Sequence, residues 1–128
     1  MKIASVVARI LLGLIFFVLG LNGFLQFIPA PPPTGLAGTF FGVILASHYS
    51  VLVFGVQVIA GAMLLLNQFV PLALVLLAAV LANVLAYHIT MMPSGLPLAL
   101  FVTLLWFAVA LPLRSHFAPL LAQKAQAN

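Results

Sequence analysis

The sequence contains no aspartate, no glutamate and no cysteine. Without side-chain carboxylates the chain cannot form the acid–base pairs of hydrolases, a Ser–His–Asp triad or the carboxylate relay of a proton-coupled pump. Without cysteine it cannot form internal disulfides, thiolate nucleophiles, iron–sulfur clusters or Cys-ligated zinc sites. The sequence therefore predicts no catalytic constellation within the chain, which is at most a subunit of an oxidoreductase.

Charge of either sign is scarce. Lys and Arg together number four, charged residues make up 3% of the chain, and hydrophobic residues make up 66%. Soluble domains carry about 25% charged residues. This composition cannot cover a water-facing surface, so we expect membrane lipids to surround the chain. No basic run or basic–aromatic pattern is present, which argues against a nucleic-acid partner.

Four apolar segments are long enough to cross a bilayer as helices, which takes about 17–25 residues. We expect spans at residues 3–27, 50–66, 70–89 and 97–113, followed by a polar C-terminal tail at residues 115–128. The predicted fold is all-α: a polytopic membrane four-helix bundle that forms a single transmembrane domain.

The segment between the first two spans has its own pattern. Pro29 and the run Pro31–Pro33 end the first span, because proline lacks the backbone donor that a helix needs. Residues 35–49 are apolar but too short to span, and they predict a short interfacial or re-entrant helix. The first apolar stretch continues to Phe27 and is followed by a poor cleavage context at Ala30, so we expect a retained helix and not a signal peptide.

The cationic residues lie only in the terminal regions, at Lys2, Arg9, Arg114 and Lys124. By the positive-inside rule, this distribution predicts that both termini are cytoplasmic and that the proline-containing loops face outward.

Small residues recur along the spans and favour close packing of helices. Ala78, Ala82 and Ala86 repeat every four residues in the third span. This spacing places them on one helix face, which we interpret as a packing face.

Polar side chains inside a membrane normally face the protein interior, because lipid cannot hydrogen-bond to them. The outer halves of the first three spans carry five such candidates: Asn22, Gln26, Gln57, Asn83 and His88. We expect them to converge in one layer, lined with phenylalanines, that can bind a small and mostly apolar ligand. The alternative is that they only link helices, where an interhelical hydrogen bond contributes about 0.6 kcal/mol on average.

Other polar groups leave further alternatives open. His48 and His88 could ligate haem or a metal from the outer side, but they lack acidic or cysteine partners, so no metal site is predicted. Arg9 lies within the first span and has no acid to pair with. It either extends to the cytoplasmic headgroups or contacts an anionic ligand.

The spans also resemble the DoxX-like family of small four-span bacterial membrane proteins, over about residues 3–114. The matching motifs are Arg9–Gly13 (RILLG), Phe16–Gly20 (FFVLG), Gly55–Gly61 (GVQVIAG) and His88 at the end of the third span. The resemblance implies a multi-pass protein of the bacterial inner membrane with a partner role in redox processes, since the namesakes of the family are linked to thiosulfate:quinone oxidoreduction. The family often has glutamate where this chain has Gln57, which keeps hydrogen bonding and removes ionisation.

Two main functions follow as hypotheses. In the first, the chain is a quinone-associated redox subunit: Gln57, Asn83 and His88 hydrogen-bond the quinone head group, and Asn22 and Gln26 complete the pocket. In the second, it is a non-catalytic accessory or scaffold subunit of a larger membrane complex, whose partners are membrane lipids and other membrane or redox subunits. A carrier of a small apolar ligand is a third hypothesis.

Overall fold

The structure, a computed structural model, describes residues 2–127. Within this range all regular structure is helical, which confirms the predicted all-α class. The α-helices are α1 (Lys2–Leu25), α2 (Gly35–Ala46), α3 (Ser50–Leu65), α4 (Val70–Thr90) and α5 (Leu96–Ala110). Three short 3₁₀ helices are η1 (Pro93–Gly95), η2 (Leu111–His116) and η3 (Ala118–Leu121).

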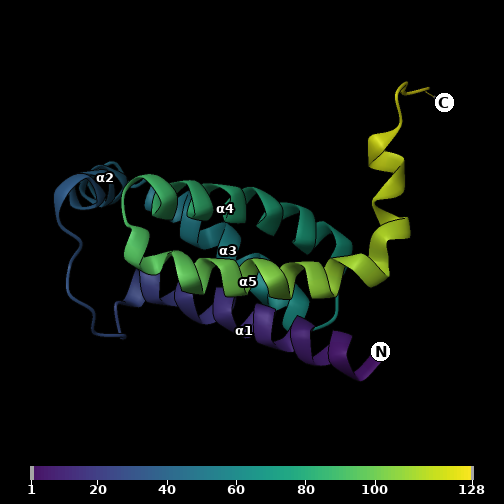
Figure 1. The fold of residues 1–128 in the computed structure, drawn as a ribbon, viewed down its shortest axis with the longest axis horizontal. Helices are drawn as coiled ribbons and strands as arrows, with labels where there is room; N and C mark the ends of the chain where they lie inside the picture. Colours follow the sequence, from purple (N-terminus) through teal and green to yellow (C-terminus); the bar gives the residue numbers. More distant parts are fainter. Residues whose placement is uncertain (1, 128) are drawn as a thin grey trace.

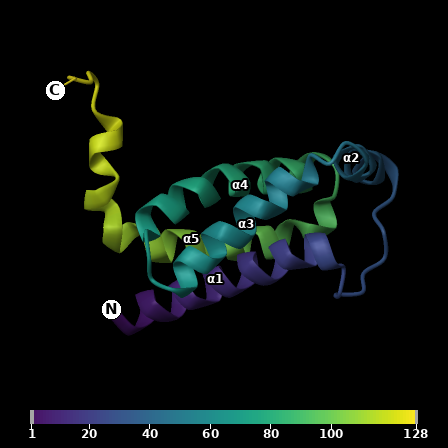
Figure 2. The same ribbon diagram turned by 180° about the vertical axis from the view of Figure 1, so that it is seen from behind.

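Helices α1, α3, α4 and α5 run side by side as an elongated bundle (Figure 1). Helix α2 lies across one end of the bundle and is seen nearly end-on in Figure 1, because it is bent by 87° relative to α3. Both chain termini lie at the opposite end, as the reverse view in Figure 2 also shows. We call these two ends of the molecule the α2 end and the terminal end.

Three helical stretches are long and apolar enough to cross a membrane: α1, α4, and residues Pro93–His116 around α5. The bent pair of α2 and α3 makes a fourth if it is counted as one span. Helix α3 alone has 16 residues and is therefore about 24 Å long. The expected helix between the first two spans is present as α2, and its bounds are shorter than residues 35–49.

The turns follow from local chemistry. Helix α1 ends at Leu25, two residues before the predicted end, because Gln26 takes a left-handed φ of 51°. Asn67 and Phe69, each with φ of 54°, make the sharp turn between α3 and α4, close to where the sequence predicts it. Pro71 lies in the first turn of α4, where its missing N–H costs no helical hydrogen bond.

The last α-helix ends before residue 113, the predicted end of the last span, although the apolar helical stretch Pro93–His116 includes that residue. Helix α5 ends at Ala110, and Leu113 has φ of −103° and ψ of 15°, which are not helical values. Pro112 cannot donate a backbone hydrogen bond, so the α-helix gives way to the 3₁₀ turns of η2. Part of the predicted polar tail is thus helical, and it turns away from the bundle (Figure 1).

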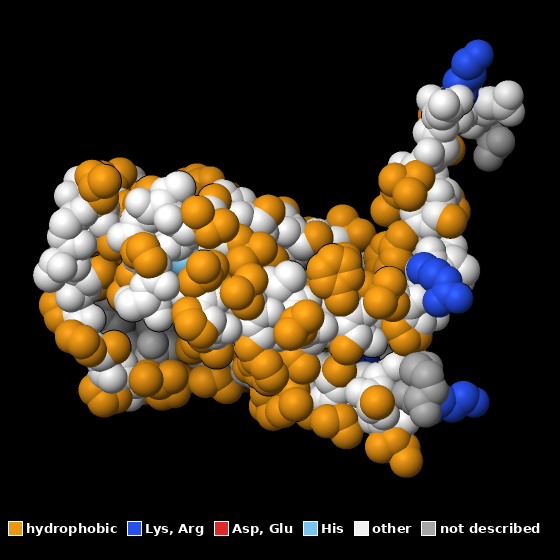
Figure 3. All heavy atoms as spheres, in the orientation of Figure 1, with side chains coloured by type: hydrophobic (Ala, Val, Ile, Leu, Met, Phe, Trp, Pro, Cys, Tyr) orange, Lys and Arg blue, Asp and Glu red, His pale blue; other side chains and the backbone are white. Residues whose placement is uncertain are grey.

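The largest fully buried side chains of the core are Leu12, Leu64, Leu74 and Leu77, and α5 adds Val102, Val109 and Ala110. Large hydrophobic side chains are also exposed along every α-helix and cover the outside of the bundle (Figure 3). On the face shown there, Lys and Arg lie at the terminal end and on the chain that leaves it. The described chain is thus apolar on both its inner and outer surfaces.

Candidate functional site

The structure shows no hydrogen bond or ring contact between any two of the five polar residues predicted to form one layer. Two of them belong to the end of α1. The Asn22 side-chain oxygen accepts a hydrogen bond from the backbone N–H of Ile28 over 2.7 Å, so this amide holds the chain where it leaves the helix. Gln26 is exposed at the next turn. Neither lines the larger cavities described below.

Gln57 is the buried member of the set, with 8% of its surface exposed. It lies on the inward face of α3 with Ala60, Gly61 and Leu64. Its amide makes no hydrogen bond to any residue that the structure describes. No wholly buried polar side-chain atom of the described residues lacks a partner, so the unbonded amide of Gln57 is not fully enclosed and can hydrogen-bond to another molecule.

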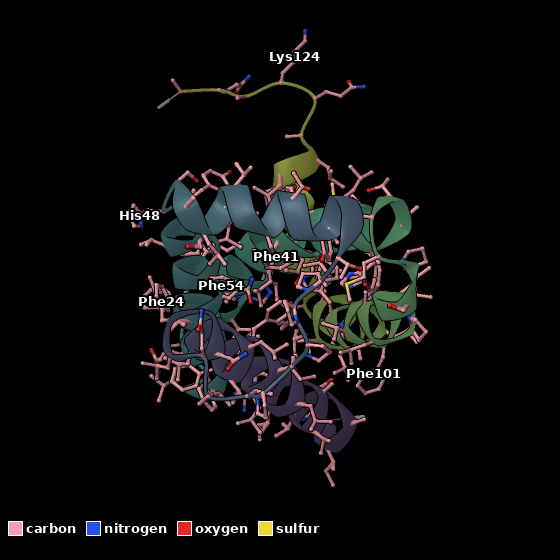
Figure 4. The ribbon with its side chains drawn as sticks, turned by 90° about the vertical axis from the view of Figure 1, so that its left-hand side faces the viewer. Phe24, Phe41, His48, Phe54, Phe101 and Lys124 are labelled. Atoms are coloured by element: carbon pink, nitrogen blue, oxygen red, sulfur yellow. The ribbon has the colours of Figure 1, made fainter. Side chains whose placement is uncertain are left out.

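Phenylalanine rings lie one turn from Gln57 toward the α2 end. The ring of Phe54 meets Phe24 edge-on, with 6.3 Å between ring centroids, and Figure 4 shows both from that end. The Phe54 ring also fills the space beside Gly23. A Cβ at position 23 would overlap this ring, so glycine is needed there. Of the phenylalanines in this region, Phe54 thus lies one turn from Gln57, while Phe24 and Phe27 are both exposed.

Asn83 lies on the outside of α4. It is exposed, and its side-chain N–H donates to the carbonyl of Ala79 in the same helix over 2.8 Å. Ala78, Ala82 and Ala86 are exposed as well. The prediction of a small-residue packing face is therefore wrong within the described chain, because this face of α4 packs against none of its other helices. We call Ala78, Ala82, Asn83 and Ala86 the outer α4 face.

His88 is half-buried at the α2 end of α4. Its Nδ1 lies 2.8 Å from the carbonyl oxygen of Val84, and since a carbonyl only accepts, Nδ1 carries the proton. In the neutral ring Nε2 is then an acceptor, and it lies against Gly95, where a Cβ would overlap it. The His88 ring also meets Tyr87 edge-on at 5.0 Å. His88 is thus held in place by its own helix and by the turn that follows.

A cavity of about 340 Å³ lies at the α2 end, between the proline-rich loop and the turn before α5. Its walls are Pro31–Thr34, Ala37 and Met91–Ser94. None of the five predicted residues lines it.

His48 is exposed at the corner between α2 and α3 and points away from the bundle (Figure 4). The described chain contains no cluster of three or more His, Cys, Asp or Glu residues suited to a metal ion.

A larger cleft of about 600 Å³ lies at the terminal end. Its polar wall, which we call the cationic wall, is formed by Lys2, Ser5, Arg9, Asn67 and His116. Arg9 is half-buried, and its Nη1 donates to the carbonyl of Leu64 near the end of α3. Sequence reasoning singled out Arg9 but missed the cleft, because its walls come from the start of α1, the α3–α4 turn and the segment after α5.

Sequence reasoning also missed Trp106, the only tryptophan in the chain. Its ring N–H donates to the carbonyl of Leu74 over 2.9 Å and so links α5 to α4. A single indole N–H within an apolar span is a signal that could have found this contact, because a buried indole usually finds an acceptor.

We compared the chain with models of protein families, with curated protein sequences and with solved structures, and none of them matches it significantly.

Proposed function

We propose that the chain is a DoxX-like multi-pass protein of a bacterial inner membrane that serves as a non-catalytic accessory subunit of a larger membrane complex. The outer α4 face is the proposed contact surface for a helix of another membrane subunit. In the proposed topology the terminal end is cytoplasmic, in line with the positions of the cationic residues.

The observation that carries this proposal is the exposed amide of Asn83 among alanines. Asn83 satisfies one of its amide N–H groups within its own helix, and its side-chain oxygen has no partner among the described residues. A polar amide that faces lipid is costly, and in membrane bundles such groups hydrogen-bond to a neighbouring helix. The alanines on either side leave room for that helix to approach closely.

Site-specific photo-crosslinking tests the proposal in native membranes. A photoreactive residue at Ala82, on the outer α4 face, should give a defined adduct with another membrane protein. The same residue at Ala108, exposed on α5, is the matched control and should give none. Introduction of Asn83→Leu should reduce the adduct from position 82. Equal adducts from both positions, or an adduct only with a second copy of the chain, would contradict an accessory role.

A second candidate function, association with a quinone, is supported by Gln57. Its buried amide has no hydrogen bond within the described chain, and phenylalanine rings lie one turn away. A quinone carbonyl is an acceptor that an amide N–H can serve. The proposed role is limited to Gln57, since Gln26 and Asn83 are exposed. Asn22 and His88 make hydrogen bonds to the backbone of Ile28 and Val84.

Extraction of bound lipids from protein purified in mild detergent tests this candidate. Quinone should co-purify with the natural chain and be lost with Gln57→Leu, while Asn83→Leu should retain it. If both variants and the natural chain carry the same quinone content, the quinone hypothesis fails and the accessory role is unaffected.

A further inference from the structure

The cleft at the terminal end gathers positive charge that nothing in the sequence can neutralise. Two of its wall residues, Lys2 and Arg9, carry positive charge, His116 adds an imidazole, and the chain has no Asp or Glu at any position. Lys2, Ser5 and Arg9 are spaced three and four residues apart on α1, so they share one helix face. The α1 part of the cationic wall therefore runs along the first two turns of that helix.

Arg9 has more donors than its contacts within the chain use. The guanidinium carries five N–H donors, and one of its nitrogens donates to the carbonyl of Leu64. That carbonyl belongs to the last turn of α3, where a cation also interacts favourably with the helix dipole. This contact leaves the positive charge without an anion and most N–H groups free for another acceptor. A half-buried guanidinium with free donors is suited to a further anionic acceptor.

The helix ends around the cleft reinforce the preference for an anion. Helix α4 begins at Val70, and Val70 and Pro71 form part of the cleft wall. Helix α1 also begins here, at Lys2. The first backbone N–H groups of a helix lack acceptors within it and carry partial positive charge. The start of α4 therefore contributes the backbone N–H of Val70 to the cleft lining, since Pro71 has none, and Lys2 at the start of α1 lines the same cleft.

The rest of the cleft lining is apolar and includes Phe69, Val109 and Leu113. The volume of about 600 Å³ falls in the range of small-molecule sites. A small soluble anion would use only the cationic wall, whereas a lipid would place its headgroup there and its acyl chains against the apolar lining.

We propose that this cleft binds a phosphate group through Arg9, with Lys2 and His116 at its mouth. The amphipathic lining favours an anionic membrane lipid as the source of the phosphate over a soluble phosphate. Arg forms charge-assisted and often bidentate hydrogen bonds with phosphate, which makes it suited to this role. The inference concerns the opposite end of the molecule from Gln57 and does not depend on the proposed partner of α4.

Native mass spectrometry of the full chain in mild detergent tests the proposal. The probes are phosphatidylglycerol, diacylglycerol with the same acyl chains, and inorganic phosphate. The natural chain should retain phosphatidylglycerol and not diacylglycerol. Arg9→Gln should weaken this binding about tenfold, as expected when a charge-assisted hydrogen bond is lost.

Arg114→Gln is the matched control. Arg114 lies near the same end, carries the same charge and donates its Nη1 to a backbone carbonyl, that of Leu111, over 2.9 Å. It does not line the cleft. Binding of phosphatidylglycerol should therefore be unchanged in Arg114→Gln. Equal losses in the two variants, or equal retention of the two lipids by the natural chain, would overturn the proposal, because either result means that the cleft does not select phosphate.

Competition with inorganic phosphate distinguishes the two possible sources of the bound phosphate group, a lipid headgroup and a soluble ion. If millimolar phosphate binds through Arg9 and displaces the lipid, the site recognises phosphate itself; if it does not displace the lipid, the acyl chains are required. Because Arg9→Gln also removes a contact to α3, the double variant Lys2→Gln/His116→Gln serves as a second test at exposed positions. It should weaken lipid binding severalfold, while Lys124→Gln should not. The same affinity in these two variants would also overturn the proposal.

Discussion

Gly61 of α3 lies against the backbone of α1 at Gly13. A Cβ at position 61 would lie 2.9 Å from the carbonyl oxygen of Gly13 and 2.6 Å from the backbone nitrogen of Phe17. A Cβ at position 13 would in turn lie 3.1 Å from the carbonyl oxygen of Gly61. The two helices therefore meet backbone to backbone, which small residues permit and any larger residue prevents.

Replacement of Gly61 by alanine should destabilise the bundle by about 1–3 kcal/mol, because the added methyl group forces two backbones apart. Thermal unfolding in detergent measures this effect. Gly55→Ala on the same helix is the matched control, since a Cβ there meets nothing within 4 Å. It should be neutral or stabilising by about 0.5–1 kcal/mol, the usual difference between glycine and alanine in a helix. Equal destabilisation by the two variants would contradict this account of the α1–α3 contact.

The hydrogen bond from Trp106 to the carbonyl of Leu74 joins two helices, so its loss should be measurable. Trp106→Phe should lower the free energy of unfolding by about 0.5–1.5 kcal/mol. Thr103→Val is the comparison, because the Thr103 hydroxyl donates to Ala99 within its own helix and links no second element. Denaturation of both variants in the same detergent should show the larger loss for Trp106→Phe. The reverse order would show that this contact contributes little to the bundle.

The helix bounds could be predicted from the sequence to within a few residues. Which polar side chains face the interior could not be predicted. Apolar length and proline positions are strong signals, and they located α1, α3, α4 and the turn after Leu66. The inward face of each helix was not readable, because in this chain both faces are apolar. Asn83 and Gln57 therefore looked alike in the sequence, although one is exposed and the other is buried.

The end of α5 and the terminal cleft were missed for a different reason. The predicted last span ran through Pro112, because its flanking residues are apolar, and the backbone at Leu113 is not helical. The cleft depends on how that altered segment lies beside α1 and the α3–α4 turn. Contacts between residues that far apart leave no periodic pattern in a single sequence.

The proposed topology has a direct test. Because the chain contains no cysteine, a single introduced cysteine provides the only thiol for labelling. Pro32→Cys in the proline-rich loop and Gln123→Cys beyond η3 are both at exposed positions. A membrane-impermeant maleimide added to intact spheroplasts should label position 32 and not position 123. Permeabilised spheroplasts should be labelled at both, which controls for reactivity. Labelling of position 123 in intact spheroplasts would reverse the proposed orientation.

Aromatic rings connect α2 to α4, and loss of these ring contacts should loosen α2. Tyr87 on α4 packs against Phe40 and Phe41 of α2, with ring centroids 5.6 and 5.4 Å apart. Each such pair contributes about 0.5–1.5 kcal/mol beyond its buried area. Tyr87→Ala should therefore raise the population of molecules with α2 detached by roughly fivefold or more.

A thiol at Ala37 reports this detachment, since Ala37 is the buried residue of α2, with 2% of its surface exposed. In the Ala37→Cys background, Tyr87→Ala should increase the rate of maleimide labelling by the same factor. Tyr87→Phe keeps the ring and loses only the 3.4 Å hydrogen bond to the Met92 sulfur, a weak acceptor, so it should label at the original rate. If Tyr87→Ala also leaves the rate unchanged, the proline-rich loop and the turn at His48 hold α2 in place without the rings.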